Sequence, residues 1–245
     1  MFYKFTLVLT GLIYFFGLEL IIFRMDFLPF ILTLLLLMAL FESKKIGKKW
    51  KFSIIPVFLV ASSVALLSLI ALVYEQQIFI ILATGMFYLL ILGTYRLGLY
   101  AGDQTAKGML MAATSATIFF SFAASYGLYL NFFVPLYTLL LTYLAVTFLV
   151  SYQYFSIIER EHRKVFLYSF LLALIMVEII WTMNFWPFGY LTTGVVALIL
   201  YYVLWDLTQS YFLNLLSRKR VIANMLFFSV MIIVVLVSAK WIPVI

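Results

Sequence analysis

The sequence predicts an all-α fold, a polytopic transmembrane bundle of about nine helices. Three observations support this prediction. First, the 245 residues are 67% hydrophobic and only 10% charged, whereas a soluble domain carries about 25% charged residues, so the main solvent of this chain must be lipid. Second, apolar runs long enough to cross a bilayer recur along the chain. Third, the cationic residues gather in alternate connecting segments.

The apolar runs define the predicted spans, because crossing the hydrocarbon takes about 20 residues of helix. They cover residues 5–23, 27–42, 53–74, 78–96, 108–127, 132–152, 165–183, 188–206 and 221–243. The first run follows a single Lys4 and contains no small-x-small cleavage site. We therefore expect an uncleaved first span and not a signal peptide.

The distribution of Lys and Arg predicts the orientation. When the loops alternate between two sides, only Arg24 and Lys240 of the 16 cationic residues fall on one side. The other side holds Lys4, Lys44, Lys45, Lys48, Lys49, Lys51, Arg96, Lys107, Arg160, Arg163, Lys164, Arg218, Lys219 and Arg220. The positive-inside rule then places the N-terminus in the cytoplasm and the C-terminus outside the plasma membrane.

A short repeat indicates how the bundle is built. Residues 21–30 (IIFRMDFLPF) and 179–188 (IIWTMNFWPF) are identical at six of ten positions, and residues 130–136 (LNFFVPL) are related. We interpret one membrane domain, 1–245, as hairpins of about 1–51, 52–104, 105–163 and 164–220 with a final helix 221–245. Convergence on similar short turns is the alternative. Parallel repeats occur in some transporters, so the repeat alone does not select a function.

The repeated turns share an acidic or amide residue before a proline. Asp26, Asn131 and Asn184 each precede a helix that runs back into the membrane. Asp and Asn accept hydrogen bonds from free backbone N–H groups, so we predict that these side chains cap the N-termini of the following helices. The remaining external turn, residues 75–77, lacks the Phe and the Pro.

Few ionisable side chains fall inside the predicted spans, and such residues are functional candidates because burying them is costly. Glu19 and Glu178 lie in the outer parts of the first and seventh spans, at nearly matching places in the two repeat copies. Pairing either carboxylate with a basic residue predicts an external polar cluster of Glu19, Arg24, Glu178 and Lys240. The alternative is that both carboxylates reach the headgroups and bind water.

The fifth span carries a stripe of small and hydroxyl residues four apart. These are Ala113, Thr117, Ser121 and Ser125. Small residues let helices approach closely, and hydroxyls bond between helices, so the stripe predicts a central packing helix. The alternative is a polar groove for a substrate beside this helix.

Two inner segments suggest partners. In residues 154–164, Glu159 and Arg163 form an i, i+4 pair that predicts a helical extension. In residues 206–220, aromatic and leucine side chains would lie along the inner interface while the basic residues meet anionic headgroups. The expected partners are therefore the lipid bilayer and its anionic headgroups at the inner basic loops. A membrane-protein partner or a homo-oligomer is the alternative, and cations confined to short loops do not predict nucleic-acid binding.

The sequence lacks the usual catalytic and metal-binding motifs. It has no cysteine and no H-E-x-x-H, and its one histidine, His162, stands in a charged loop. Gly102-Asp103 follows Tyr100-Ala101 and so lacks the first Gly of a G-x-G-D motif. We therefore expect no catalytic residue, no metal and no cofactor.

The last part of the chain carries a resemblance. Glu178, the stretch Asn184-Phe185-Trp186-Pro187-Phe188-Gly189-Tyr190 and Ala239-Lys240-Trp241 together resemble uncharacterised polytopic membrane proteins of small-genome bacteria over about the last 70 residues. The resemblance implies no known activity. The sequence thus predicts a non-catalytic integral membrane protein, a scaffold or subunit that binds partners or lipids. The alternative is a small transporter or lipid-handling protein with a cavity beside the fifth helix.

Overall fold

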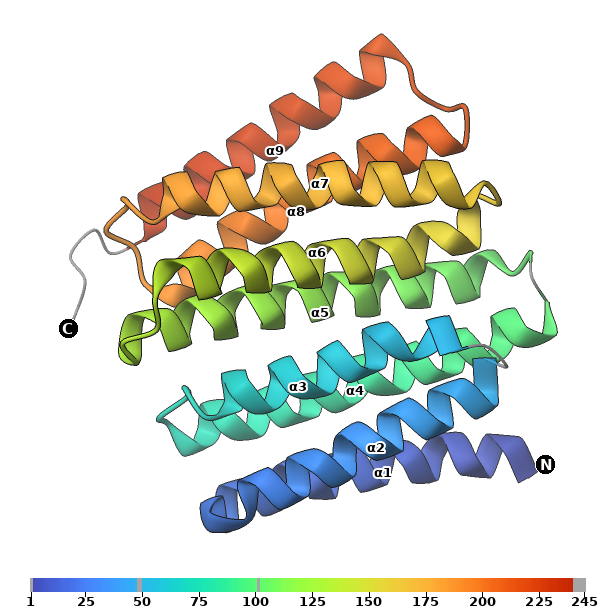
Figure 1. Ribbon diagram of the computed structural model, residues 1–245, viewed down its shortest axis with the longest axis vertical. Coiled ribbons are helices and arrows are strands. Elements are labelled where there is room, and N and C mark those ends of the chain that lie inside the picture. Colours follow the sequence, from blue (N-terminus) through green and yellow to red (C-terminus); the bar gives the residue numbers. More distant parts are fainter. Residues whose placement is uncertain (1, 48–49, 101, 240–245) are drawn as a thin grey trace. The chain divides into compact units, whose positions relative to one another are not determined.

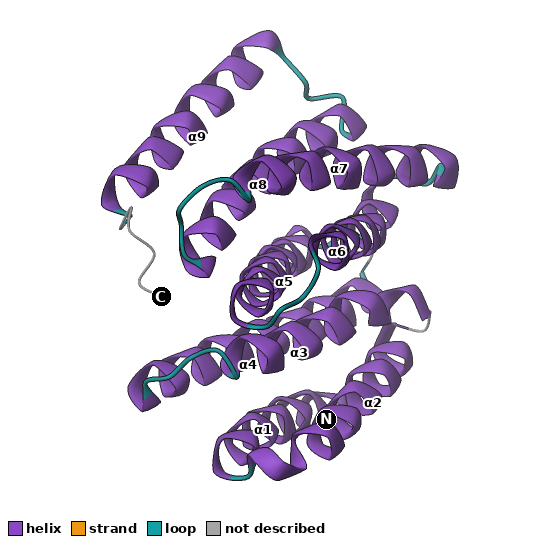
Figure 2. Cartoon of the chain, turned by 60° about the vertical axis from the view of Figure 1, so that its left-hand side comes forward, coloured by secondary structure: helices purple, strands orange, loops and turns teal. Residues whose placement is uncertain are grey.

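The computed structural model describes residues 2–47, 50–100 and 102–239, and within them the fold is all-helical (Figures 1 and 2). The α-helices are α1 (Phe2–Phe23), α2 (Leu28–Gly47), α3 (Ile54–Leu67), α4 (Val73–Leu99), α5 (Gln104–Asn131), α6 (Leu136–Ile158), α7 (His162–Met183), α8 (Tyr190–Phe212) and α9 (Arg218–Ser238). Two short 3-10 helices, η1 (Met25–Phe27) and η2 (Trp50–Ser53), join the first three α-helices. The predicted all-α fold is confirmed.

Eight helices of the described chain are long and apolar enough to cross a membrane, which makes this a multi-pass membrane protein. The exception is α3, which has 14 residues. At about 1.5 Å per residue it spans roughly 21 Å, less than the roughly 30 Å of a hydrocarbon core. The third predicted span, residues 53–74, is therefore not one continuous helix.

The early end of α3 follows from local hydrogen bonds. Ser63 Oγ donates to the carbonyl of Val60 at 2.9 Å, and Ser68 Oγ donates to that of Ala65 at 2.7 Å. Such back-bonding competes with the helical ladder. Gln76 Nε2 then reaches back from α4 to the carbonyl of Ile70 at 2.7 Å. Because α4 begins at Val73, residues 75–77 lie in its first turns and not in the external loop that the sequence predicted.

The structure forms two compact units, Met1–Ser121 and Phe122–Ile245, with the boundary inside α5. The first unit holds α1 to α4 and the first part of α5. The second holds the rest of α5 and α6 to α9. Within each unit successive helices are antiparallel, so their connections alternate between two ends (Figure 1).

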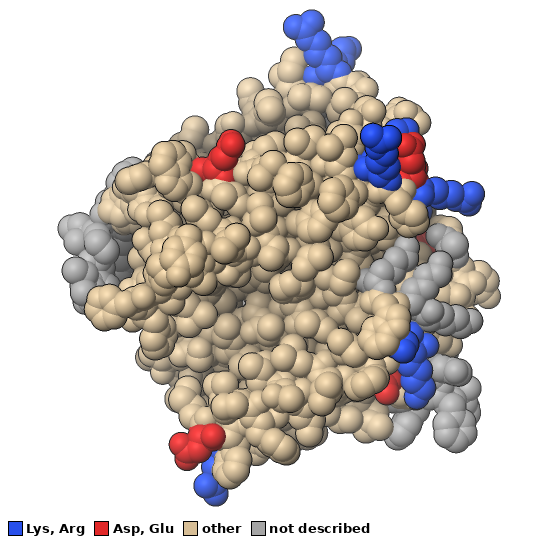
Figure 3. Space-filling model, in the orientation of Figure 1, with Lys and Arg blue, Asp and Glu red and all other residues tan. Residues whose placement is uncertain are grey.

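Cationic side chains separate by end within each unit. In the first unit, Lys44, Lys45, Arg96 and Lys107 lie near the α2–α3 and α4–α5 connections. In the second, Arg160, Arg163, Lys164, Arg218 and Lys219 lie near the α6–α7 and α8–α9 connections. Figure 3 shows blue side chains gathered at such ends, with broad tan surfaces between them. Which end faces the cytoplasm stays a prediction.

The predicted N-caps are not formed. Asn131 is the last residue of α5, and its Nδ2 donates to the carbonyl of Gly127 at 2.8 Å. Asn184 directly follows α7, and its backbone N–H bonds to Ile180. Asp26 lies inside η1 and not next to α2. The capping prediction is therefore wrong, because both asparagines finish the helix before the turn.

The two strong repeat copies differ in their surroundings. Met25 and Phe30 are 56% and 69% exposed, whereas the aligned Met183 and Phe188 are 2% and 5% exposed. The α1–α2 turn contains a 3-10 helix, whereas residues 184–189 link α7 to α8 as an irregular loop. A duplication of hairpins stays a prediction.

The predicted helical extension over residues 154–164 is also wrong. α6 ends at Ile158 and α7 begins at His162. Glu159 Oε1 instead accepts the backbone N–H groups of Arg160 at 2.7 Å and of Glu161 at 3.0 Å. These bonds turn the chain, and the ion pair that forms here joins Glu161 to Lys164 at 2.7 Å.

Candidate functional site

Three of the four residues of the α5 stripe, Ala113, Thr117 and Ser121, are buried between helices. Ala113 and Thr117 are fully buried. Thr117 Oγ1 donates to the carbonyl of Ala113 at 2.7 Å, and Ser125 Oγ lies 3.3 Å from that of Phe122. Ser121 is 5% exposed. The hydroxyls of Thr117 and Ser125 thus bond to carbonyls of their own helix, as expected for a packing helix.

Small residues let each half of α5 approach a neighbour inside its own unit. In the first unit, a Cβ added to Gly93 of α4 would lie 3.1 Å from the carbonyl oxygen of Ala106. In the second, a Cβ added to Gly194 of α8 would lie 2.9 Å from Ala123 Cβ. Both glycines therefore mark close helix–helix contacts of the kind that small residues permit in membranes.

Aromatic residues lock the second half of α5 to α6. The rings of Phe122 and Tyr143 stack with centroids 4.2 Å apart. Tyr143 Oη donates to the carbonyl of Phe122 at 3.0 Å. Both side chains are fully buried, so this contact holds α5 and α6 together inside the second unit.

Each unit also contains a buried tyrosine–serine hydrogen bond that the sequence interpretation missed. Tyr14 of α1 bonds to Ser63 of α3, and Tyr201 of α8 bonds to Ser151 of α6 at 3.0 Å. All four residues are at most 1% exposed. Each of these tyrosines stands inside an apolar run, away from the membrane interfaces where tyrosine prefers to lie, and this position in the sequence could have indicated a buried hydrogen bond.

The buried polar residues outside the aromatic ones are all neutral. Among the residues whose burial the structure describes, they are serines, threonines and Gln153, and no Asp, Glu, Lys, Arg or His is buried as a whole; one oxygen of Glu42 is shielded from solvent. The same residues contain no group of three His, Cys, Asp or Glu side chains that could hold a metal ion. The interior of either unit thus offers hydrogen bonds for packing and no acid–base pair.

The predicted external cluster is only partly described. In the first unit, Glu19 accepts a hydrogen bond from Gln77 Nε2 at 3.1 Å. The ion pairs found among the described side chains are Arg96–Asp103 and Glu161–Lys164, so Glu19 and Arg24 are not paired with each other there. In the second unit, Glu178 is exposed. Lys240 lies outside the described residues, and the cluster stays a prediction.

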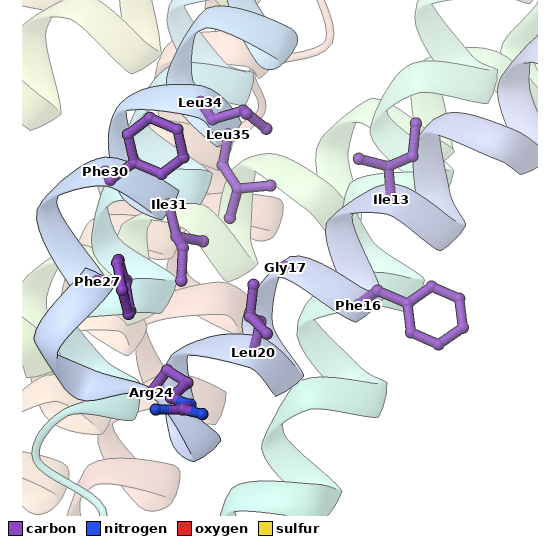
Figure 4. Close-up of a pocket in the computed structure, with 10 residues that line it drawn as sticks. All are labelled: Ile13, Phe16, Gly17, Leu20, Arg24, Phe27, Phe30, Ile31, Leu34 and Leu35. Carbon is purple, nitrogen blue, oxygen red and sulfur yellow. The ribbon is translucent and has the colours of Figure 1, made fainter.

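An apolar groove lies between α1 and α2 beside Arg24 (Figure 4). Its volume is about 610 Å³. It is lined by Ile13, Phe16, Gly17, Leu20, Arg24, Phe27, Phe30, Ile31, Leu34 and Leu35. Sequence reasoning selected Arg24 as a partner for a carboxylate, but the structure places it at the rim of this groove.

A true N-cap occurs at the other end of the first unit, and the sequence interpretation missed it. Asp103 Oδ1 accepts the backbone N–H of Ala106 at 3.1 Å, and its Oδ2 lies 2.7 Å from Arg96 Nε. The Ala106 N–H, and then Arg96, hold the pKa of the Asp103 carboxyl below its usual value. The signal was an aspartate directly before the helix that starts at Gln104.

The last helix has little contact with the rest of its unit. Within α9, residues Val221–Ser238 include no buried residue. Asn224 Nδ2 donates to Asp206 of α8, and the rings of Phe228 and Tyr202 lie 5.3 Å apart. α9 therefore presents most of its apolar surface to its surroundings.

The comparisons with known proteins identify a family but no activity. No curated protein and no solved structure matches the chain. One family does match, described as protein of unknown function DUF5656, over residues 32–238. This range includes all of α3 to α9, and therefore the α5 stripe. The match covers most of the sequence, and the chain belongs to the DUF5656 family.

Proposed function

We propose that this protein is a non-catalytic subunit or scaffold of the plasma membrane, with a cytoplasmic N-terminus, that binds partner proteins or lipids. The observation that carries the proposal is the use of the α5 stripe for packing. Thr117 bonds to its own helix, and Ala123 meets Gly194 at close range. A transporter needs polar groups that a substrate can reach, whereas Ala113 and Thr117 of this stripe are fully buried and Thr117 Oγ1 bonds within its own helix.

The neutral interior supports the same proposal. Ionisable groups inside a membrane protein mark ion and proton pathways because burying them is costly. Among the side chains whose burial the structure describes, no Asp, Glu, Lys, Arg or His is buried as a whole, and only one oxygen of Glu42, near the end of α2, is shielded without a hydrogen-bond partner. The exposed apolar surface of α9 fits a protein whose role is to contact other membrane components.

A small transporter is the second candidate, favoured by the hydroxyl content of α5 and the hairpin repeat. Cysteine labelling separates the two, because the chain has no native cysteine. We expect Ala113→Cys and Thr117→Cys to be inert to a membrane-impermeant thiol reagent. Gly189→Cys serves as the reactive control, since a side chain there meets no atom within 4 Å. Rapid labelling at position 113 or 117 would replace the subunit proposal with a transporter.

A second measurement tests the binding role directly. The tagged protein is extracted in a mild detergent and its mass is measured by native mass spectrometry against the 28.4 kDa of the bare chain. A protein or lipid held in fixed ratio supports the proposal. A bare chain that keeps its fold after complete delipidation, with no retained component, contradicts it.

A further inference from the structure

We propose that the α1–α2 groove binds one acyl chain of an anionic phospholipid, with the lipid phosphate against Arg24. This inference rests on the proposed function and names the lipid class. It also commits to one place on the protein, the groove shown in Figure 4.

The shape of the groove fits an extended apolar ligand. Ile31 and Leu35 form its floor at 6% and 1% exposure. Phe16, Leu20 and Phe30 rise at its sides and are 64%, 50% and 69% exposed. The volume of about 610 Å³ lies in the ordinary range of ligand pockets, roughly 300–1,000 Å³. All ten lining residues except Arg24 are apolar.

The length of the groove matches one leaflet. Its lining residues on α1 run from Ile13 to Phe16, Gly17 and Leu20, and Arg24 follows directly after the helix. The eleven residue-to-residue steps from Ile13 to Arg24 correspond to roughly 16 Å at about 1.5 Å per residue. Half of a hydrocarbon core of about 30 Å is about 15 Å. The groove therefore reaches from the membrane boundary to about the midplane, as one acyl chain does.

Charge selects the headgroup. Arg24 stands at the end of α1, where the chain leaves the apolar span, and it takes part in neither ion pair found among the described residues. The neighbouring carboxylate of Glu19 is not a groove residue and accepts a hydrogen bond from Gln77. A guanidinium binds phosphate oxygens in a bidentate manner. A lipid with net negative charge is therefore preferred over a zwitterionic one.

Gly17 keeps the groove open at its base. A Cβ on Gly17 would lie 2.7 Å from Leu35 Cδ2. The absence of a side chain lets the backbone of α1 come close to α2 here, and Leu20 of α1 and Leu34 of α2 line the groove on the two walls at different levels (Figure 4). Filling the groove from one of these walls is accordingly the direct way to exclude the ligand.

The test uses the purified full chain with phosphatidylglycerol and phosphatidylcholine of the same acyl length, counted as bound lipids by native mass spectrometry. Leu34→Trp fills the groove. Leu37→Trp is its matched control, because Leu34 and Leu37 lie on the same helix at 48% and 51% exposure and only Leu34 lines the groove. We expect Leu34→Trp to lower phosphatidylglycerol binding at least about fivefold, and Leu37→Trp to leave it unchanged.

Substitutions of Arg24 test whether this side chain recognises the lipid headgroup. We expect Arg24→Gln to lower phosphatidylglycerol binding roughly tenfold while phosphatidylcholine binding stays the same, and Arg24→Lys to retain part of the preference. Millimolar inorganic phosphate should not displace the lipid, because the acyl chain supplies most of the contact; displacement would show a free anion site. Far-UV circular dichroism and elution volume check that each variant is folded.

Equal effects of the two tryptophan variants, or equal binding of the two lipids to the unaltered protein, would overturn the proposal. Such a result leaves the subunit role standing, since that role fails only through labelling of α5 or through loss of every bound component. The two failures are therefore distinguishable.

Discussion

Gly194→Ala tests whether close packing of α5 and α8 defines the second unit. The new Cβ would lie 2.9 Å from Ala123 Cβ and 3.1 Å from Ala123 Cα. Carbon atoms in favourable contact lie about 3.5–4.0 Å apart, so the two helices must separate by roughly 0.6 Å. The obstructing atoms belong to the backbone or are attached to it directly, so a rotamer change cannot relieve the contact.

The expected magnitude follows from two opposing terms. Overpacking costs about 1–3 kcal/mol. Replacing a helical glycine by alanine gains up to about 1 kcal/mol of helix propensity. Gly85→Ala in α4 is the matched control, because a Cβ there meets no atom within 4 Å and only the favourable term applies. The propensity term cancels between the two variants, so Gly194→Ala should be less stable than Gly85→Ala by about 1–3 kcal/mol.

The assay is unfolding in mixed micelles by titration with sodium dodecyl sulfate, followed by far-UV circular dichroism. Ala123→Gly, combined with Gly194→Ala, removes the nearest obstructing atom. We expect a favourable coupling of about 1 kcal/mol in the double-mutant cycle. Equal stability of Gly194→Ala and Gly85→Ala, or a cycle without coupling, would refute the packing argument.

Three further outcomes are expected. Gly102→Cys should react with an impermeant thiol reagent only after the membrane is permeabilised, whereas Gly189→Cys should react from outside in intact cells. A side chain at either position meets no atom within 4 Å, so both cysteines are accessible. The opposite pattern would reverse the topology. Because the pKa of Asp103 is lowered in the folded protein, its stabilising effect is present above about pH 4 and is lost as the pH falls through the folded pKa. The difference in melting temperature between the unaltered protein and Asp103→Ala should therefore shrink in acid, and a constant difference would argue against the cap. If Glu178 is paired with a basic residue, Glu178→Gln should lower the melting temperature of the purified protein, whereas an unchanged value indicates a carboxylate bound by water.

The number and approximate position of the helices could be predicted because each helix in lipid must satisfy its own backbone hydrogen bonds. A segment that crosses the lipid therefore appears in the sequence as one continuous run of apolar residues. The ends of the helices were harder to predict. α3 stops at Leu67 although the apolar run continues: Ser68 Oγ bonds back to the carbonyl of Ala65, and Gln76 Nε2 bonds to the carbonyl of Ile70 just beyond the helix.

The capping prediction failed for a related reason. A polar residue in a turn can serve the helix before it or the helix after it, and the choice depends on where the following helix starts. Asn131 is five residues before the start of α6 at Leu136, too far for an N-cap, so its side chain bonds back to Gly127. Asp103 stands next to Gln104 and does cap the helix that follows.

The candidate site depended on contacts between distant parts of the chain. The sequence marked Arg24 as an unusual cation but paired it with carboxylates, and nothing in its neighbourhood along the chain indicates a groove. The groove needs residues of both helices, such as Leu20 of α1 and Leu34 of α2, together with the missing side chain at Gly17. In the same way, the contact between Gly194 and Ala123 joins helices that are far apart in sequence.

The amino-acid sequence alone determined the solvent of this protein, its helical class and the separation of its charges, because these depend on hydrophobicity summed over single segments. Only the tertiary structure decided that Thr117 of α5 is buried and bonded within its own helix and that Arg24 borders an apolar groove. Those features depend on distances of a few ångströms between segments, and such distances arise from how side chains interlock when the helices meet.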